Sequence, residues 1–180
     1  MSKKTIMYCH GRGSSGRGSK ATKIMEYFSE HHFVGNDYPT NDKVELDKNK
    51  PMDWPLHEMK DFWQYVQMLK GDIQIHKPDV IVASSFGGAV LMRVILEGAW
   101  TGPTVFLSMA GAKFGVGDRI PTTVPAIFIH GLDDTVVEIK DVQALAEASA
   151  SSFIAVKDGH RLKETVSYNA YIKAIQAFLD

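Results

Sequence analysis

The sequence contains a single cysteine, Cys9, among its 180 residues. One thiol cannot form an intramolecular disulfide, so the fold must be stabilised without one. A large excess of either charge is also missing, because 20 basic residues are balanced by 21 acidic ones and the formal net charge is −1. Proteins that bind nucleic acid or anionic membranes generally carry a strongly basic surface. We therefore expect neither a nucleic acid nor a membrane as partner.

Long apolar runs are absent as well. The run near the start, residues 5–9, is TIMYC, whereas a secretory signal peptide needs about 7–15 apolar residues and a membrane span about 20. The sequence shows no internal repeat, no low-complexity segment and no stretch that resembles a linker between domains. We therefore expect a cytoplasmic protein that forms a single domain over residues 1–180, a length that can bury a substantial core.

The chain alternates between strand and helix patterns. Short apolar runs predict six strands, at residues 5–9, 32–37, 79–84, 104–109, 126–130 and 152–157. Apolar residues at helical spacing predict the intervening helices, over about 19–29, 56–73, 87–97, 139–146 and 166–178. Continuous apolar strands separated by helices are typical of a parallel sheet that is covered on both faces. The predicted fold class is α/β, a three-layer α/β/α sandwich with about six mostly parallel strands. Ligands of such sheets bind at the carboxyl ends of the strands.

The segment ASSFGG, residues 83–88, has the pattern of a nucleophile elbow. A nucleophile on a sharp strand-to-helix turn has a strained backbone, and the flanking chain closes tightly around it. The residues two before and two after it must therefore be small, as Ala83 and Gly87 are around Ser85. Ser84 has bulkier residues at those positions and fits the pattern badly. We predict that Ser85 is the nucleophile; the alternative is an ordinary serine N-cap of the following helix.

A serine hydroxyl needs a base, and the base needs a carboxylate that orients it. His160 directly follows the last predicted strand, in the segment DGH, and is the candidate base. Asp133 and Asp134 follow the strand before it, and the pattern H-G-x-x-D-x-V-V favours Asp134 as the acid. Taken alone, His160 could be a solvated loop histidine and the two acids could cap a turn. Together with Ser85 they form the order nucleophile, acid, base, each after a different predicted strand.

The glycine-rich segment HGRGSS, residues 10–15, follows the first predicted strand. An oxyanion needs two main-chain donors, one from the residue after the nucleophile and one from the loop after an earlier strand. These donors are predicted to be the backbone N–H groups of Phe86 and Arg12, with Gly13 as the alternative to Arg12. Only the amide of Arg12 is needed, so its side chain is expected to face solvent or an anion of the substrate.

The segments HGRGSSGRGSKAT, ASSFGG, HGLDDTVV and DGH together resemble the α/β-hydrolase family, in particular the compact bacterial serine esterases with little or no cap domain. The resemblance spans nearly the whole chain and implies a minimal α/β-hydrolase fold without the first antiparallel strands of larger members. It also implies hydrolysis of small carboxylic esters, with thioesters as a related possibility, through a Ser-His-Asp triad. Two positions depart from the pattern: Ala83 replaces the usual first glycine, and Arg12 stands where relatives often carry an aromatic or apolar residue.

Parts of the sequence are also compatible with two other functions. Gly11, Gly13 and Gly16 match G-x-G-x-x-G, and Asp37 falls where the ribose-binding acid of a dinucleotide-binding Rossmann protein would stand. That interpretation leaves the candidate nucleophile, acid and base unexplained. The second is a binding module with the same fold and an idle triad. No metal-ligand spacing such as H-E-x-x-H occurs, so we expect no metal and no cofactor, and a small acyl ester as partner.

Two features were expected to shape the substrate site. The polar segment 38–55 could act as a small lid over it. Trp54 and Trp63 could line an apolar acyl pocket, although Trp63 also lies on the apolar stripe of a predicted helix and is then a core residue.

Overall fold

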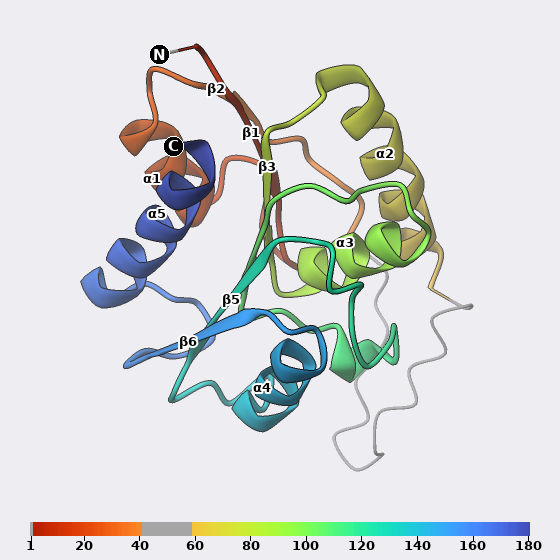
Figure 1. Cartoon of the computed structure of the whole chain (residues 1–180), viewed down its shortest axis with the longest axis vertical. Coiled ribbons are helices and arrows are strands. Elements are labelled where there is room, and N and C mark those ends of the chain that lie inside the picture. Colours follow the sequence, from red (N-terminus) through yellow and green to blue (C-terminus); the bar gives the residue numbers. More distant parts are fainter. Residues whose placement is uncertain (1, 41–58) are drawn as a thin grey trace.

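In the computed structural model, which describes residues 2–40 and 59–180, the chain forms one sheet with helices on both of its faces (Figure 1). The strands are β1 (Thr5–Cys9), β2 (His32–Val34), β3 (Val80–Ser84), β4 (Thr104–Leu107), β5 (Ala126–Gly131) and β6 (Ser152–Val156). The helices are α1 (Ser19–Tyr27), α2 (Lys60–His76), α3 (Phe86–Leu96), α4 (Ile139–Ala148) and α5 (Thr165–Leu179), with a short 3₁₀ turn, η2 (Ala112–Phe114). The predicted three-layer α/β/α sandwich is confirmed.

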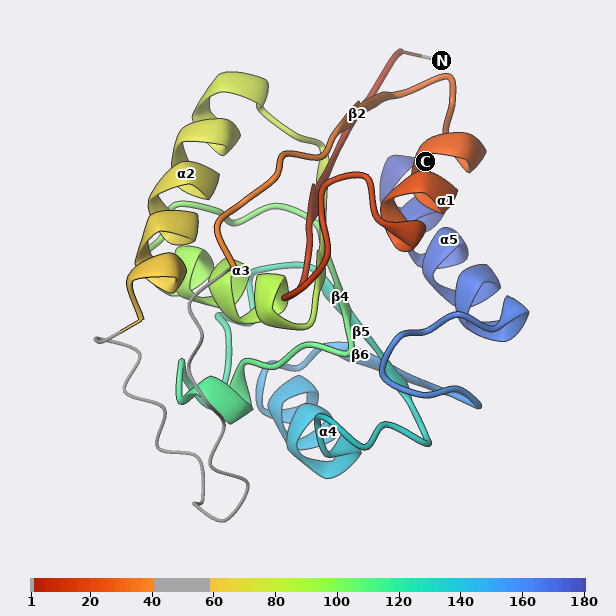
Figure 2. The same ribbon diagram turned by 180° about the vertical axis from the view of Figure 1, so that it is seen from behind.

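Side chains that alternate along the strands build two apolar cores, one on each face of the sheet. In β1, Met7 and Cys9 belong to the core that is covered by α2, α3 and α4. Ile6 and Tyr8 belong to the opposite core, under α1 and α5. The two groups of helices are seen on opposite sides of the sheet in Figures 1 and 2. Every residue of β3 and β4 is buried, as expected for central strands of a parallel sheet with both faces covered.

The strand order is β2-β1-β3-β4-β5-β6, and all neighbouring pairs are parallel. The chain leaves β1 toward β2 at one edge, and then passes back across β1 to β3. All later strands add in the other direction, so β6 forms the second edge. The loops after β1 and β3 therefore diverge, and such a switch point is where open α/β sheets bind ligands.

Two predicted strands end two or more residues earlier in the structure. β2 ends at Val34 rather than residue 37 because the main chains of Gly35 and Gly16 lie in direct contact, where a Cβ on either residue would overlap the other's carbonyl oxygen. β4 ends at Leu107 rather than residue 109 because the next residue, Ser108, has a left-handed φ of 43° and turns the chain out of the sheet.

Part of the predicted lid and helix falls outside the described residues. Trp54 and most of the proposed lid, residues 38–55, lie there, as do the first residues of the predicted helix over 56–73. Trp63 is described, and its partly buried side chain packs against the core. Among the residues that the structure describes, no helix has both the length and the apolar content needed to cross a bilayer.

Candidate active site

Ser85 occupies the sharp turn between β3 and α3. Its backbone has φ 52° and ψ −116°, a positive φ that is strained for any residue other than glycine. The turn leaves no space beside it, since a Cβ on Gly87 would lie 2.5 Å from the carbonyl oxygen of Cys9. The N–H of Ser85 donates to the carbonyl of Leu107 at 2.9 Å. Neighbouring main chain therefore holds the strained turn in place, with the serine at the carboxyl end of β3.

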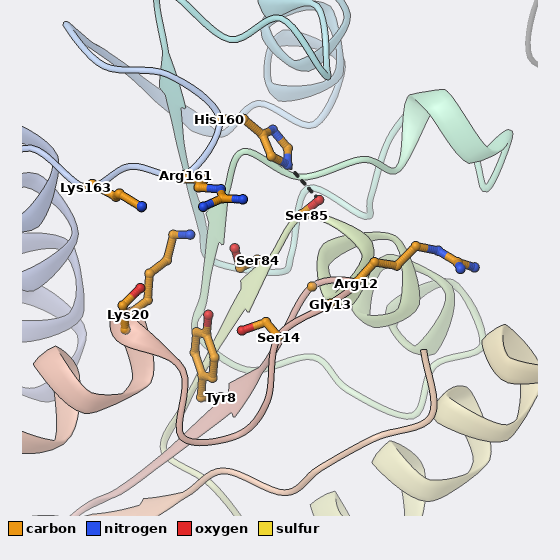
Figure 3. Close-up of a pocket in the computed structure, with 12 residues that line it drawn as sticks. Tyr8, Arg12, Gly13, Ser14, Lys20, Ser84, Ser85, His160, Arg161 and Lys163 are labelled. Atoms are coloured by element: carbon orange, nitrogen blue, oxygen red, sulfur yellow. Dashed lines mark hydrogen bonds between the residues drawn. The ribbon is translucent and has the colours of Figure 1, made fainter. Parts of the chain in front are cut away.

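His160 lies within hydrogen-bond distance of both other candidate residues. Its Nε2 is 2.9 Å from Oγ of Ser85, and its Nδ1 is 2.8 Å from Oδ2 of Asp134 (Figure 3). With Nδ1–H donating to the carboxylate, Nε2 is left to accept from the serine hydroxyl. The structure thus brings Ser85, His160 and Asp134 together from three separate loops.

The carboxylate of Asp134 is fully buried, with no exposed side-chain surface. Its second oxygen, Oδ1, accepts the backbone N–H groups of Val136 at 2.8 Å and Val137 at 2.9 Å. Burial by itself would raise the pKa of Asp134, but the hydrogen bonds from His160, Val137 and Val136 outweigh it and lower the pKa below its usual value. Asp133, the alternative acid, instead forms an exposed ion pair with Lys157.

The acid loop and the base loop are packed directly on each other. A Cβ on Gly131 would overlap the main chain of Asp158, and the N–H of Asp133 donates to the Asp158 carbonyl at 2.9 Å. The Asp158 carboxylate accepts hydrogen bonds from the N–H groups of Gly159 and Glu164 in its own loop and from the hydroxyl of Ser167 in the first turn of α5. Asp158 therefore shapes the turn that presents His160, a role that its position in a D-G turn indicated only in part.

His130 also contacts the candidate acid, Asp134, a role that the sequence analysis did not predict. Its ring is fully buried, and Nε2 lies 3.0 Å from the Val137 carbonyl and 3.2 Å from Oδ2 of Asp134. Burial lowers the pKa of His130 and favours the neutral ring. A neutral ring protonated at Nε2 directs its N–H group toward the Val137 carbonyl and lies close to Asp134. The spacing H-G-x-x-D was a signal for this contact.

The loop after β1 lies against the serine. A Cβ on Gly11 would lie 3.1 Å from Cβ of Ser85, so only glycine allows this approach without displacement. The buried ring of His10 fixes the loop, since Nδ1 is 2.9 Å from the Gly11 carbonyl and Nε2 accepts the N–H of Tyr38. Phe86 is the first residue of α3, where N–H groups have no partner within the helix. Of the two predicted oxyanion donors, Phe86 thus directly follows Ser85, and Arg12 directly follows Gly11, whose main chain lies against Ser85.

The Arg12 side chain differs from its expected position. It was expected to face solvent or a substrate anion, but its guanidinium lies 3.2 Å from Oδ2 of Asp61 and 4.4 Å above the centre of the Phe86 ring. Figure 3 shows it extending over α3, away from the other basic side chains of the site. The reason is Asp61, a buried carboxylate on α2, which attracts the guanidinium away from the cavity.

The residues that suggested a nucleotide site serve another purpose. The N–H of Gly16 donates to Oδ1 of Asp37 at 2.8 Å, and Gly16 itself is packed on Gly35. The proposed ribose-binding acid is therefore used to hold the glycine-rich loop, which counts against the Rossmann alternative. Within residues 2–40 and 59–180, no group of three or more His, Cys, Asp or Glu side chains is placed to hold a metal ion.

A cavity of about 310 Å³ opens beside Ser85 and His160 at the switch point of the sheet. Its lining comes from β1 and the loop after it, the start of α1, the β3–α3 turn and the loop after β6. The lining residues are Tyr8, Gly11, Arg12, Gly13, Ser14, Ser19, Lys20, Ser84, Ser85, His160, Arg161 and Lys163 (Figure 3). A substrate bound here would be in contact with the candidate nucleophile.

Comparison with known proteins bears on the fold. No protein-family model matches the sequence, and no curated protein is significantly similar to it. Solved structures are similar over almost the whole chain. XCC1541 from Xanthomonas campestris pv. campestris, provisionally named a hydrolase of the alpha/beta superfamily, is 21% identical, with 98% of this chain and 99% of that chain covered and a TM-score of 0.72.

Two further structures agree with this. XC6422 from Xanthomonas campestris, described as an a/b serine hydrolase without lid, is 14% identical, with 99% of this chain and 84% of that chain covered and a TM-score of 0.69. Esterase PE8 is 14% identical, with 98% and 93% covered and a TM-score of 0.66. The chain therefore has the compact α/β-hydrolase fold that its sequence predicted.

Proposed function

We propose that this chain, which has the α/β-hydrolase fold, is a serine hydrolase that cleaves small carboxylic esters, with thioesters as a related substrate class. The observation that carries the proposal is the continuous set of hydrogen bonds from Ser85 through His160 to Asp134 on a strained turn. A hydroxyl 2.9 Å from an imidazole that is oriented by a buried carboxylate is the arrangement that activates serine. The names of two similar structures, an esterase and a serine hydrolase, point the same way.

In the proposed reaction, Nε2 of His160 takes the hydroxyl proton as Oγ of Ser85 bonds to the acyl carbon of the ester. Asp134 keeps Nδ1–H in place and stabilises the imidazolium that forms. The imidazolium then gives its proton to the departing alkoxide, which leaves as the alcohol. Water, deprotonated by the same ring, adds to the acyl-enzyme and releases the carboxylic acid with Ser85 regenerated.

The negative charge that develops on the carbonyl oxygen needs donors that are already in position. We assign this role to the backbone N–H groups of Phe86, which follows Ser85, and Arg12, which follows the Gly11 that lies against Ser85. Removing one such donor from a comparable site costs about 10²–10³ in kcat. The buried ion partner of Arg12, Asp61, then acts at a distance by holding the loop that carries one donor.

Labelling with a fluorophosphonate tests the proposal, because the reagent forms a bond with an activated serine only. Wild-type protein should be labelled, and Ser85→Ala should lose both the label and more than about 10³-fold of its p-nitrophenyl acetate turnover. Ser84→Ala is the matched variant, one residue away. Labelling that persists in Ser85→Ala and disappears in Ser84→Ala would contradict the assignment. A wild-type protein that neither reacts nor turns over esters would indicate a binding module with an idle triad.

A further inference from the structure

Three basic side chains surround the cavity beside Ser85. Lys20 comes from the first turn of α1, and Arg161 and Lys163 come from the loop between β6 and α5. Figure 3 shows the three extending toward a common space from two sides, with their nitrogen atoms facing it. Segments far apart in the sequence therefore place three cations together in the cavity that Ser85 and His160 also line.

Within the described part of the chain, these cations are not paired with carboxylates. Among the residues that the structure describes, no Asp or Glu lies within ion-pair distance of Lys20, Arg161 or Lys163, whereas Arg12 of the same cavity pairs with Asp61. The carboxylate with the largest effect on the pKa of Lys20 is Asp158, and both of its oxygens already accept hydrogen bonds from its own loop and from Ser167 of α5.

Grouping these charges is unfavourable in the free protein. Burial, together with the nearby charges of Arg161 and Lys163, lowers the pKa of Lys20 to about 8, against the opposing effect of Asp158. An anion placed among the three side chains would offset this repulsion and restore the charged form of Lys20. A chain with a net charge of −1 has no general excess of positive charge that would account for the cluster.

The start of α1 also favours an anion in the cavity. Ser19 and Lys20 of its first turn line the cavity, and this turn contains no acidic residue and no side chain that caps the backbone. The N-terminus of a helix carries a partial positive charge and N–H groups without a partner in the helix. An anion in the cavity would therefore meet a helix terminus as well as the three basic side chains.

We propose that the ester carries an anionic group, a carboxylate or phosphate, which binds Lys20, Arg161 and Lys163 while the ester carbonyl lies at Ser85. The inference rests on the proposed hydrolase function and narrows its substrate class. Because the anion subsite and the serine line one cavity of about 310 Å³, the anion and the ester bond belong to one small molecule. The anion is carried on either the acyl side or the alcohol side of the bond.

Two pairs of esters distinguish these sides. Mono-p-nitrophenyl adipate against p-nitrophenyl hexanoate places a carboxylate on the acyl side, and 4-acetoxybenzoate against its methyl ester places one on the alcohol side. The measurement is the ratio of kcat/KM for the anionic ester to that for its neutral partner. We expect a ratio above about 10 in at least one pair, a preference equivalent to 1.4 kcal/mol, and we expect it to fall as potassium chloride is added.

The variants Lys20→Gln, Arg161→Gln and Lys163→Gln should each lower that ratio, Lys20→Gln by at least about tenfold. Lys173→Gln, an exposed lysine on α5 outside the cavity, is the matched control and should keep it. The ratio of two kcat/KM values measured on the same variant does not depend on how much of the protein is folded. Arg161 and Lys163 are exposed, so their replacement does not disturb the core.

The possible failures are distinct. If the neutral esters are cleaved as fast as the anionic ones, or if the ratio is the same in the three variants, the anion subsite is wrong and the hydrolase function stands. If the wild-type protein cleaves none of the four esters and is not labelled by fluorophosphonate, the proposed function is wrong and the subsite inference fails with it.

Discussion

Oδ2 of Asp134 lies 2.8 Å from Nδ1 of His160, while the adjacent Asp133 points outward to Lys157. Two neighbouring acids of the same loop thus have different environments, one buried against an imidazole and one in an exposed ion pair. The difference yields a direct test. Asp134→Asn should lower kcat by about 10³–10⁴, because an amide neither fixes the tautomer of the ring nor stabilises the imidazolium.

Asp133→Asn is the matched control for that variant. It removes an exposed ion pair, an interaction whose loss usually costs about 0–1 kcal/mol of stability. Its esterase activity should therefore stay within about threefold of wild type, as measured by steady-state kinetics on p-nitrophenyl acetate. A larger loss in Asp133→Asn than in Asp134→Asn would show that the wrong acid was assigned.

The preference for anionic esters should depend on pH through Lys20. Burial, together with Arg161 and Lys163, lowers the pKa of Lys20 to about 8, with Asp158 and Asp134 acting in the opposite direction. Below that pH Lys20 is charged and attracts the anion, and above it Lys20 becomes neutral. The ratio of kcat/KM for anionic over neutral esters should therefore decrease between about pH 7 and 9.5.

A lysine-to-arginine exchange isolates this effect. Arginine stays charged throughout that range, so Lys20→Arg should keep its preference for anionic esters up to about pH 9.5. A wild-type ratio that is constant across the range, or one that falls equally in Lys20→Arg, would show that another group controls the preference.

The glycine of the elbow can be tested against a glycine of a helix. Gly87→Ala would place a Cβ 2.5 Å from the carbonyl oxygen of Cys9, and a forced shift of packed main chain typically costs about 1–3 kcal/mol. Gly71→Ala in α2 meets nothing within 4 Å and should stabilise the protein by about 0.5–1 kcal/mol. Urea unfolding measures the free energy of unfolding of both variants. A Gly87→Ala variant as stable as the wild-type protein would contradict the close packing of the elbow.

The ion pair of Arg12 and Asp61 is expected to hold in place the loop after β1, which carries the proposed oxyanion donor of Arg12. Arg12→Ala and Asp61→Ala should each reduce kcat/KM, since the loop that carries the Arg12 amide loses its attachment to α2. The double variant should lose less than the sum of the single variants, with a coupling of about 0.5–3 kcal/mol for residues in contact. Strictly additive losses would show that the two side chains act independently.

Much of the fold follows from local patterns in the sequence. The run Val80–Ser84 is rich in β-branched residues and is wholly buried, so strand propensity and burial agree there. The strand ends were less accurate, because Ser108 and Gly35 leave the sheet for reasons of main-chain geometry and packing. The small residues around Ser85 could be recognised because the demand for them is local, within two positions on each side.

Contacts between distant segments could not be predicted in this way. Nothing local shows that Lys20 on α1 lies beside Arg161, or that the Arg12 side chain finds Asp61 on α2 rather than the cavity. These neighbours depend on how the helices dock on the sheet. The geometry that joins Ser85, His160 and Asp134 is observed, while their catalytic roles stay predictions until the variants are measured.

The hydrogen bond between Ser85 and His160 joins two segments of different local stability. Ser85 follows β3, which is paired on both sides, whereas His160 follows β6, which in the described part of the chain pairs with β5 alone. Outer strands exchange their amide protons through smaller opening motions than inner ones. In deuterium uptake the segment that bears the imidazole should open first, so that heating should abolish the proposed activity before the rest of the molecule unfolds.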